Sequence, residues 1–524
     1  MKMNIGAKII ESVLFNQNKN QIIYNSEIIS NILVVNRTIS LAENLVQKKN
    51  YLVGQRVLLI LRDSPEFIYS FIATILIGCI PVPINPLIKE EELEYILEDS
   101  KASHIIIDED QFERLNKLLL NAKNIQSKDI LIREKSSIPL QQIAKVSSIN
   151  CLIDNNDRSI QLILKDFQNR TNDIAFWQYT SGTTGNPKAV QHGHETMLVN
   201  TYSFAKDVLN ISKQDTVISI SKMFFGYGLG NSLFFPLLLG STIILDDQWF
   251  SVNQVRRIIS ENQLTVFFGS PKVYVDLLAV DDENFDQELS KIETFISAGA
   301  ALPNSIRKLW YQRIGKRIVN GIGSTEIGHI FINDKSLNLS IDNVLGKPVQ
   351  GYKIRLCNPE NPEEEILTPD HIGELCISPP YSLSSYWQKE EENARKYIHG
   401  WYHSGDLCSK NIDGIYLFHC RKDDLFKING RWINPLEIEN IIMSNVVEVE
   451  ECIFSYKYDL NRLPTPVLHI VIREDTDKTI IQNKIFSSLK GKLSSYKIPA
   501  EIFYLNAFPR NGNGKIDRKK LIIN

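Results

Sequence analysis

Short runs of β-branched and aromatic residues alternate with longer amphipathic stretches along most of the chain. The runs have the length and composition of strands, whereas stretches such as residues 90–99 and 252–262 repeat apolar positions at helical spacing. The expected strands are residues 57–62, 104–108, 174–179, 217–221, 242–245, 266–269, 294–297 and 317–320. This alternation predicts an α/β fold in which helices cover parallel sheets.

One apolar stretch has the length of a membrane span, since residues 67–84 carry no charge over 18 positions. Ser64 and Pro65 have the residue types of a helix N-cap and first helical position. Gly78 and two later prolines are expected to end that helix after about three turns. We therefore expect a buried helix followed by a short strand, and no membrane insertion.

Two regions of the chain differ in composition from the rest. The first, residues 110–160, is rich in Lys, Asn and Ser and is interpreted as surface elaboration of the α/β body. After about residue 423, the pattern predicts a helix at 435–444, strands at 451–456 and 467–473, and a helix at 478–493. We therefore predict a large N-terminal α/β domain of β–α–β sheets over residues 1–422 and a small α+β cap domain over residues 423–524.

The charge balance excludes some classes of function. The chain has 524 residues, and 58 Lys and Arg against 61 Asp and Glu give a net charge of −3. Nucleic acid is therefore not an expected partner, because phosphate binding needs a basic excess. The seven cysteines form no CxxC pair, which favours reduced thiols over a disulfide framework or a zinc site. Lys8 and Glu11 interrupt the apolar N-terminal run, so we expect a cytoplasmic protein without a signal peptide.

The strongest local motif directly follows a predicted strand and reads YTSGTTGNPK at residues 179–188. Small residues let the backbone approach an anion closely, and hydroxyls and free amides donate to phosphate oxygens. Lys188 adds a positive charge, although the spacing is not that of a Walker A loop. A solvated turn rich in hydroxyls is the alternative. The candidate phosphate-binding residues are Thr180, Ser181, Gly182, Thr183, Thr184, Gly185 and Lys188.

Residues 179–188 match the signature [YF]-T-S-G-[ST]-T-G-x-P-K throughout. The chain thereby resembles the adenylate-forming superfamily, which includes acyl-CoA synthetases, stand-alone adenylation domains and firefly-type luciferases. Further segments that resemble this family follow in the same order along the chain. The resemblance implies a large adenylate-forming domain, a mobile cap domain, and the use of ATP with Mg²⁺.

Two of these segments resemble the nucleotide site of the family. The first segment is NGIGSTEIGH at 320–329. The resemblance implies that Glu326, whose carboxylate is a hard oxygen ligand, binds the Mg²⁺ that accompanies the nucleotide, and that Thr325 contacts the α-phosphate. In WYHSGD at 401–406, it gives ribose binding to Asp406, with Arg421 at the ribose or phosphate. Taken alone, each carboxylate also fits an ordinary strand end or turn. The other implied nucleotide-binding residues are Gly299, Ala300 and Gly321.

Two C-terminal segments resemble the family's hinge and catalytic loop. In RKDDLFKINGRWINP at 421–435, Asp423 takes the place of the hinge and Gly430 that of the passage for a pantetheine arm. Cys420 departs from the family, which usually has Gly there. In PRNGNGKIDR at 509–518, Lys515 takes the place of the lysine that bridges the substrate carboxylate and the α-phosphate. A charged solvated linker and a flexible basic tail are the alternatives.

The acyl-pocket segment is expected at residues 221–231, SKMFFGYGLGN. No acidic residue occurs over 222–245, so an α-amino acid is disfavoured because its ammonium group would be buried unpaired. Aromatic residues between glycines 226, 228 and 230, which make a poor core helix, favour a flat slot for a ring. The segment resembles benzoate–CoA ligases and, more nearly, 2-aminobenzoate (anthranilate)–CoA ligases. The implied substrate-binding residues are Phe225, Tyr227, Gly228, Gly299, Gly323 and His329. A histidine bonded within the core is an equal alternative for His329.

The resemblance therefore implies an AMP-forming acid–thiol ligase that uses ATP, Mg²⁺ and coenzyme A. An aromatic acid of the 2-aminobenzoate or benzoate type would form aryl-AMP and then aryl-CoA, with Thr325, Glu326 and Lys515 as catalytic residues. One alternative is a stand-alone aryl-acid adenylation enzyme that loads the phosphopantetheine thiol of a carrier protein. The other is a non-catalytic ligand-binding homologue.

Overall fold

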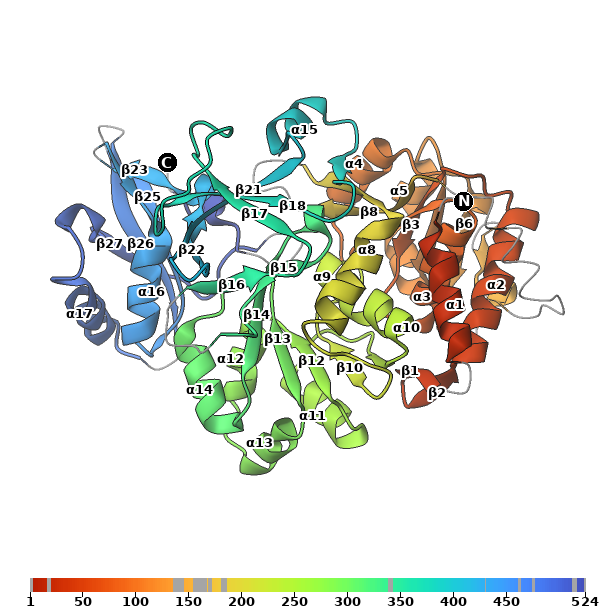
Figure 1. Cartoon of the computed structure of the whole chain (residues 1–524), viewed down its shortest axis with the longest axis horizontal. Coiled ribbons are helices and arrows are strands. Elements are labelled where there is room, and N and C mark those ends of the chain that lie inside the picture. The colour runs from red at the N-terminus through yellow and green to blue at the C-terminus, as the bar shows by residue number, and fades with distance from the viewer. Residues whose placement is uncertain are drawn as a thin grey trace.

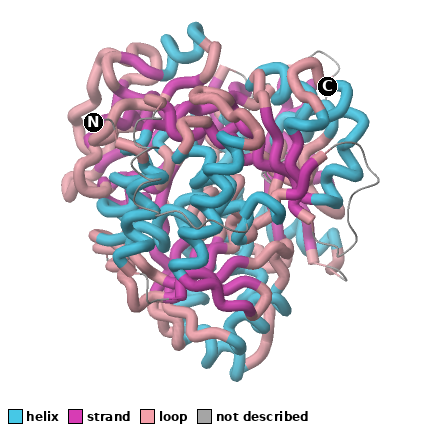
Figure 2. Tube along the Cα trace, turned by 90° about the vertical axis from the view of Figure 1, so that its right-hand side faces the viewer, coloured by secondary structure: helices cyan, strands magenta, loops and turns pink. Residues whose placement is uncertain are grey.

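The computed structural model places the N-terminal and C-terminal parts of the chain on opposite sides of the molecule (Figure 1). Helices and strands are distributed through the whole molecule, which confirms the expected α/β class (Figure 2). The structure describes residues 3–16, 20–134, 146–153, 167, 172–180, 186–337, 343–428, 430–459, 463–473, 476–510 and 516–522.

A five-stranded parallel sheet with the order β4-β3-β5-β6-β7 lies in the N-terminal part. Its strands are β3 (Arg56–Ile60), β4 (Ile80–Pro83), β5 (His104–Asp108), β6 (Ile130–Arg133) and β7 (Ser147–Ser148); its helices are α3 (Pro65–Leu76), α4 (Glu90–Ser100) and α5 (Glu109–Asn121). The Ser64 side chain caps α3 by accepting a hydrogen bond from the Phe67 N–H at 3.2 Å. The apolar stretch is thus the expected short buried helix. Within the described ranges, every helix is too short or too polar to span a bilayer.

The interpretation of residues 110–160 as surface elaboration is wrong in part. Helix α5 buries Phe112, Leu115 and Leu119, and all four residues of β6 are buried in the sheet. The Lys and Asn residues of this region alternate with those apolar positions, so the average composition concealed the buried face.

The largest sheet has 14 strands and begins with a parallel part in the order β1-β11-β10-β12-β13-β14. These strands are β1 (Asn20–Tyr24), β11 (Thr242–Leu245), β10 (Thr216–Ser219), β12 (Val266–Gly269), β13 (Thr294–Ser297) and β14 (Ile318–Gly323), with β2 (Glu27–Ser30) antiparallel at the edge. One face packs on α11 (Val252–Glu261), α12 (Pro271–Leu278), α13 (Glu283–Ser290) and α14 (Asn304–Ile314).

The same sheet becomes antiparallel between β14 and β15. The strands beyond this point are β15 (Ile330–Asn333), β16 (Val344–Pro348), β22 (Tyr416–Arg421), β21 (Trp401–Lys410), β18 (Gly373–Ser378) and β17 (Lys353–Cys357), with β20 (Tyr397–Ile398) paired to β21. The turn between β14 and β15 therefore lies at the carboxyl end of a parallel strand, the edge where α/β sheets commonly bind ligands.

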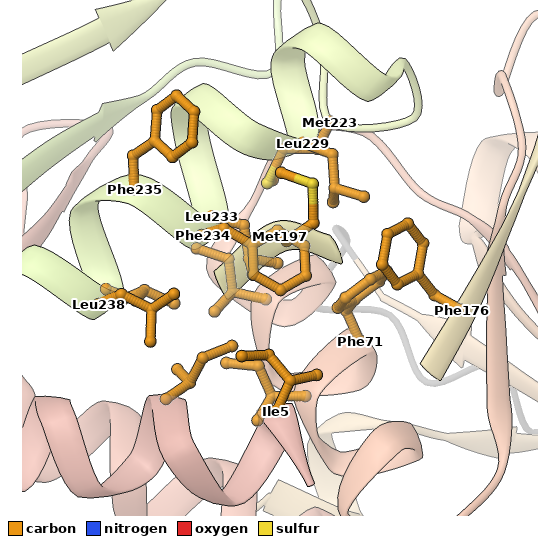
Figure 3. Close-up of a cluster of buried hydrophobic side chains, with 14 of the residues drawn as sticks. Ile5, Phe71, Phe176, Met197, Met223, Leu229, Leu233, Phe234, Phe235 and Leu238 are labelled. Carbon is orange, nitrogen blue, oxygen red and sulfur yellow. The ribbon is translucent and has the colours of Figure 1, made fainter. Parts of the chain in front are cut away.

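A small third sheet has the order β19-β9-β8. Its strands are β8 (Ile174–Thr180), β9 (Lys188–Gly193) and β19 (Ser385–Tyr386), and α15 (Glu390–Lys396) follows β19. Between the sheets lie α1 (Ile5–Phe15), α2 (Asn31–Gln47), α8 (His194–Asn200), α9 (Gly226–Leu229), the short π-helix η3 (Gly230–Phe234) and α10 (Phe235–Leu239). Their apolar faces meet in one core, in which the Phe71 ring centroid lies 5.7 Å from that of Phe176 and 5.8 Å from that of Phe234 (Figure 3).

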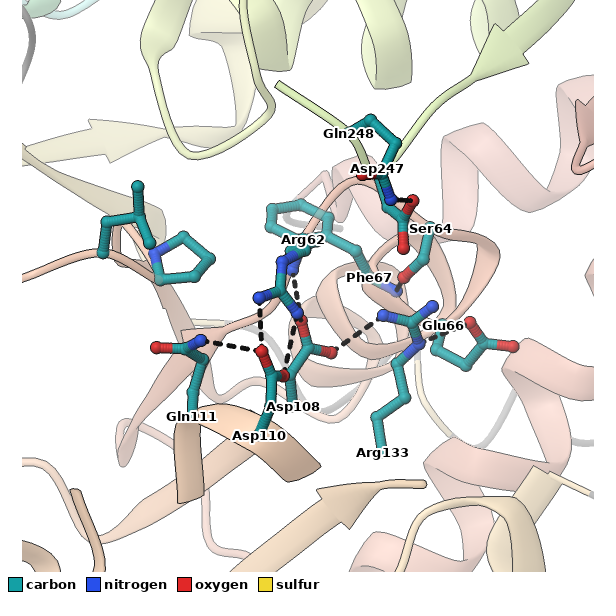
Figure 4. A network of polar contacts seen from close by, with 12 residues as sticks. Arg62, Ser64, Glu66, Phe67, Asp108, Asp110, Gln111, Arg133, Asp247 and Gln248 are labelled. Carbon is teal, nitrogen blue, oxygen red and sulfur yellow. Dashed lines mark hydrogen bonds and ion pairs between the residues drawn. The ribbon is translucent and has the colours of Figure 1, made fainter. Parts of the chain in front are cut away.

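A buried arginine lies in a network of acidic side chains at the end of the five-stranded sheet (Figure 4). Arg133, at the end of β6, donates to Asp108 Oδ1 at 2.8 Å and to Glu66 Oε2 at 3.0 Å. It also donates to the hydroxyl of Tyr24 in β1 at 2.9 Å. A buried cation needs such partners, because an unpaired charge in the interior is costly.

The C-terminal part forms a small α+β unit with its own core. Its elements are β23 (Phe426–Ile428), β24 (Arg431–Ile433), α16 (Pro435–Asn445), β25 (Val449–Tyr458), β26 (Pro464–Ile472), α17 (Lys478–Leu489) and β27 (Glu501–Tyr504). The two predicted helices and two predicted strands are confirmed, whereas β27 and the β23–β24 hairpin were not predicted. The large N-terminal and small C-terminal domains agree with the expected fold class.

Candidate active site

The predicted phosphate-binding segment connects β8 to β9. The two strands are antiparallel, and Thr180 pairs with Lys188 across the start of the connection. Ser181, Gly182, Thr183, Thr184 and Gly185 lie outside the described residues, so their predicted role stays a prediction. The hairpin nevertheless fixes where the motif starts and ends, beside β19.

Lys188 makes one contact with α15 and one with β19. Its Nζ forms an ion pair with the Glu392 carboxylate of α15. The same Nζ lies 5.6 Å from the ring centroid of Tyr386, within the range of a cation–π contact. Neither partner was predicted, because both lie about 200 residues further along the chain and belong to no motif.

Glu326 lies in the turn between β14 and β15, in a short 3₁₀ segment, η4 (Thr325–Ile327). The Ser324 side chain caps this turn by accepting from the Ile327 N–H at 3.3 Å. Glu326 is 9% exposed, and its Oε1 accepts a hydrogen bond from the Tyr386 hydroxyl at 2.7 Å. Burial raises the pKa of Tyr386, and the negative charge of Glu326 raises it further. The hydroxyl therefore keeps its proton and remains a donor. Tyr386 thus joins Lys188 and Glu326, two residues that the sequence assigned to the same site.

The Glu326 carboxylate could hold a cation that arrives with the nucleotide. Among the described residues, its one hydrogen bond reaches Oε1, which leaves Oε2 for a hard cation such as Mg²⁺. No group of three or more His, Cys, Asp and Glu side chains in the described ranges is arranged to hold a metal by itself.

Asp406 and Arg421 lie directly opposite each other on β21 and β22. Arg421 Nε is 3.7 Å from Asp406 Oδ1, and Arg421 Nη2 donates to the Ser404 carbonyl at 3.1 Å. Burial raises the pKa of Asp406, and the Arg421 guanidinium opposes that shift. Cys420, the departure from the family pattern, pairs with Leu407 and is buried, so it faces away from this pair.

The predicted acyl-pocket segment starts at the carboxyl end of β10 and runs through α9. The expectation that its glycines make a poor core helix is wrong, since Gly226–Leu229 and Gly230–Phe234 are helical and Leu229 is fully buried. The glycines permit close approach instead. A Cβ on Gly228 would lie 2.1 Å from the Lys222 carbonyl oxygen, and one on Gly230 would lie 2.5 Å from His329 Cδ2.

His329 packs against this segment and is surrounded by aromatic rings. Its ring centroid is 4.6 Å from that of Phe235 and 5.5 Å from that of Tyr227, and its Nε2 lies 3.1 Å from Asn231 Oδ1. Burial lowers the pKa of His329 to about 3, so the ring is neutral at neutral pH. Phe225 is half-buried and packs on Phe224 with ring centroids 4.4 Å apart.

The remaining predicted glycines border the same edge of the large sheet. Gly299 and Ala300 follow β13 and are exposed, and Gly299 adopts a φ of 89°. Gly321 and Gly323 lie in β14; a Cβ on Gly321 would lie 2.8 Å from the Ile330 side chain, and one on Gly323 2.7 Å from the His329 carbonyl oxygen. Gly299, Ala300, Gly321 and Gly323 therefore lie at the same end of the neighbouring strands β13 and β14.

The predicted hinge residue lies in the turn after β22, and the predicted passage residue lies in the hairpin between β23 and β24. Asp423 is exposed in the 3₁₀ turn η5 (Lys422–Asp424), and Gly430 is exposed with a φ of 75°. Lys515 lies outside the described residues. The base of its loop is described: Arg510 bridges to Ile516, and Arg518 donates to both oxygens of Glu439 at 2.7 and 2.6 Å.

Comparison with known proteins adds independent findings. The family model described as AMP-binding enzyme matches residues 29–387. The anthranilate–CoA ligase of Pseudomonas aeruginosa is 34% identical over 472 residues, which are 89% of this chain and 86% of that protein. The benzoate–CoA ligase of Thauera aromatica is 31% identical, over 89% of this chain and 85% of that protein.

Solved structures resemble the fold over nearly the whole chain. A crystal structure of an anthranilate CoA ligase in complex with anthranoyl-AMP has a TM-score of 0.87 at 26% identity, covering 99% of this chain and 96% of that one. A benzoate CoA ligase from Burkholderia xenovorans has a TM-score of 0.84 at 26% identity, covering 99% of this chain and 100% of that one.

Proposed function

Because the chain belongs to the AMP-binding enzyme family, we propose that it is an AMP-forming ligase that joins an aromatic carboxylic acid to the thiol of coenzyme A. The observation that carries this proposal is the contact chain from Lys188 through Tyr386 to Glu326. This chain joins a cation suited to phosphate and a carboxylate suited to a nucleotide-bound metal. Relatives named as anthranilate– and benzoate–CoA ligases support the same reaction.

In the first step, the acid's carboxylate oxygen attacks the α-phosphorus of ATP, and the bond to the β-phosphate breaks to release pyrophosphate. Lys188 holds the leaving phosphates, Thr325 contacts the α-phosphate, and Asp406 with Arg421 holds the ribose. Mg²⁺ bound by Glu326 with the nucleotide would neutralise phosphate charge. Lys515 bridges the acid and the α-phosphate. Since the reaction builds charge on oxygens, positioning and electrostatics supply the catalysis.

In the second step, the thiolate of coenzyme A attacks the carbonyl carbon of aryl-AMP, and the carbonyl–oxygen bond to AMP breaks. The thiol proton goes to solvent, because the thiolate is the nucleophile. We propose that the small domain turns about Asp423 between the steps, so that Lys515 leaves and the Gly430 hairpin admits the pantetheine arm. Such gating commonly limits turnover.

The acid is proposed to be benzoate or 2-aminobenzoate. Rings of Phe225, Tyr227 and His329 lie along the acyl segment, and no acidic residue occurs over 222–245 to pair an α-ammonium group. The neutral His329 ring offers a polar group to a ring substituent. Gly228, Gly299 and Gly323 complete the pocket.

Pyrophosphate exchange into ATP, measured with one acid at a time, tests the proposal. Benzoate and 2-aminobenzoate are expected to support exchange, whereas octanoate and phenylalanine are not. Equal exchange with octanoate would contradict the aromatic substrate, and no exchange with any acid would favour a non-catalytic ligand-binding homologue. Thioester formation is then compared with coenzyme A and with a phosphopantetheine-bearing carrier protein. Faster transfer to the carrier protein would contradict the proposed acceptor.

A further inference from the structure

A second lysine lies in the candidate nucleotide site, at the C-terminal end of α15. Lys396 is separated by one helical turn from Glu392, the partner of Lys188, so both side chains project from one face of α15. The helix is held in place by Asn393, whose Oδ1 accepts from the Tyr386 N–H and whose Nδ2 donates to the Tyr386 carbonyl, both at 2.8 Å. α15 packs beside β21, the strand that carries Asp406 (Figure 1).

The ammonium group of Lys396 reaches the turn that precedes Asp406. Its Nζ donates to the His403 carbonyl at 3.1 Å. A Cβ built on Gly405 would lie 3.3 Å from Lys396 Nζ and 3.5 Å from Arg421 Nη2. Gly405 has a φ of 81°, so this position already favours glycine. The two cations therefore lie over the same glycine, next to the ribose-binding candidate.

The charges around Lys396 are those of the nucleotide site. Burial lowers the pKa of Lys396, whereas the carboxylates of Glu374 and Glu326 oppose that shift. Among the described residues, the hydrogen bond to His403 is the one that the ammonium makes, although it has three donors. Lys396 is thus a partly desolvated cation with unused donors, placed near the metal-binding candidate Glu326 and the ribose-binding candidate Asp406. Such a cation suits an anionic group that lies between the metal and the ribose.

We propose that Lys396 binds the α-phosphate of the nucleotide and stays with it through both half-reactions. This inference rests on the proposed function. Lys515 would leave the site with the small domain, whereas Lys396 belongs to the part of the chain that carries Glu326 and Asp406. When the thiolate forms its bond to the acyl carbon, the electron pair of the breaking carbon–oxygen bond goes to the α-phosphate of AMP. Lys396 stabilises the negative charge that this phosphate gains.

Binding of AMP and of adenosine, measured by calorimetry, tests this role. Lys396→Gln is expected to raise the Kd of AMP roughly tenfold, as expected for the loss of a charge-assisted hydrogen bond, and to leave the Kd of adenosine unchanged. Lys396→Arg keeps the charge and is expected to recover most of the AMP affinity. The control is Arg395→Gln, an exposed neighbour on the same helix, which is expected to bind both ligands like the wild type.

Equal loss of AMP and adenosine affinity in Lys396→Gln would mean that the residue merely holds the fold, and would overturn the proposal. Unchanged AMP affinity would overturn it as well, as would Lys396→Arg binding no better than Lys396→Gln. The binding assay needs no acid and no thiol, so it decides on Lys396 even if the proposed aromatic substrate is wrong. With supplied benzoyl-AMP, Lys396→Gln is also expected to form thioester roughly 10- to 100-fold more slowly.

Discussion

Lys188, the cation of the phosphate-binding motif, is paired with Glu392 of α15. The two side chains are 17% and 29% exposed, so solvent screens the pair only in part. If Lys188 binds the phosphates of ATP, this carboxylate has to release it first. Glu392 therefore competes with the nucleotide for the same ammonium group.

Replacing Glu392 by Gln is expected to lower the KM for ATP about two- to fivefold, since a partly exposed ion pair contributes up to about 1 kcal/mol. The control is Glu391→Gln, because Glu391 is an exposed residue of the same helix. Initial rates at varied ATP concentration measure the effect. Identical KM values for ATP in the two variants would show that Glu392 does not compete with the phosphates.

The hydrogen bond from Tyr386 to Glu326 predicts a second effect. Tyr386→Phe keeps the ring beside Lys188 but removes the donor to Glu326 Oε1. Adenylation is expected to slow roughly 10- to 100-fold, because hydrogen bonds to charged groups contribute about 1.5–3 kcal/mol. Single-turnover release of pyrophosphate measures this step.

The matched control is Tyr397→Phe. The Tyr397 ring lies 5.7 Å from that of Tyr386, and its buried hydroxyl has no hydrogen-bond partner among the described residues. This variant is expected to release pyrophosphate at the wild-type rate. A similar loss in both variants would assign the effect to packing of the tyrosine cluster.

Lys515→Ala is expected to slow adenylation roughly 10²- to 10³-fold, the scale of removing one preorganised donor. Thioester formation from supplied aryl-AMP is expected to be affected much less, because the small domain would have carried Lys515 away. The two half-reactions are measured separately on the same protein. Equal losses in both would contradict the proposed alternation of the small domain.

A buried carboxyl group beneath the acyl segment predicts a dependence of stability on pH. Asp63 is 2% exposed, and its Oδ1 accepts from the Met223 N–H at 2.9 Å. Burial raises the pKa of Asp63 to about 6, although nearby Lys222 and that hydrogen bond oppose the shift, and Asp246 and Asp247 add to it. Between the unfolded and folded pKa values, the folded chain keeps the proton that the unfolded chain has lost. The contribution of Asp63 to the free energy of unfolding is therefore fully present below the unfolded pKa, and it is lost as pH rises through the folded pKa.

Asp63→Asn removes this titration and keeps an acceptor for Met223. The stability of the variant relative to wild type is expected to rise by about 2 kcal/mol between about pH 4.5 and about pH 7.5. Urea unfolding followed by tryptophan fluorescence at both pH values measures the difference. A stability difference that does not change with pH would show that Asp63 keeps an ordinary pKa.

Much of the sheet architecture could be predicted from local patterns. The bounds of β5, β11, β12 and β13 agree with the predicted runs residue for residue, because each is a short apolar run between polar connections. The acyl segment was harder, since three glycines argue against a helix by propensity. Here close packing on Lys222 and His329 outweighs that propensity.

In the candidate site, too, some residues could be predicted from the sequence and others could not. Lys188, Glu326, Asp406 and Arg421 stand in motifs and could be named from the sequence. In the structure, Tyr386 contacts both Lys188 and Glu326, and Asp406 lies opposite Arg421. Tyr386 is 60 residues from Glu326 and lies on a two-residue strand without a motif, so only the fold reveals their contact. Lys396 and Glu392 belong to a charged helix whose composition resembles an ordinary solvated surface.

The most direct test of the central claim is mass spectrometry of the products formed by the purified protein with MgATP, coenzyme A and an equimolar panel of acids. The panel contains benzoate, 2-aminobenzoate, hydroxybenzoates, medium-chain fatty acids and amino acids. One dominant aryl-CoA mass, accompanied by AMP, is the predicted result. A fatty acyl-CoA as the main product, or aryl-AMP that accumulates without any thioester of coenzyme A, would contradict the proposed ligase.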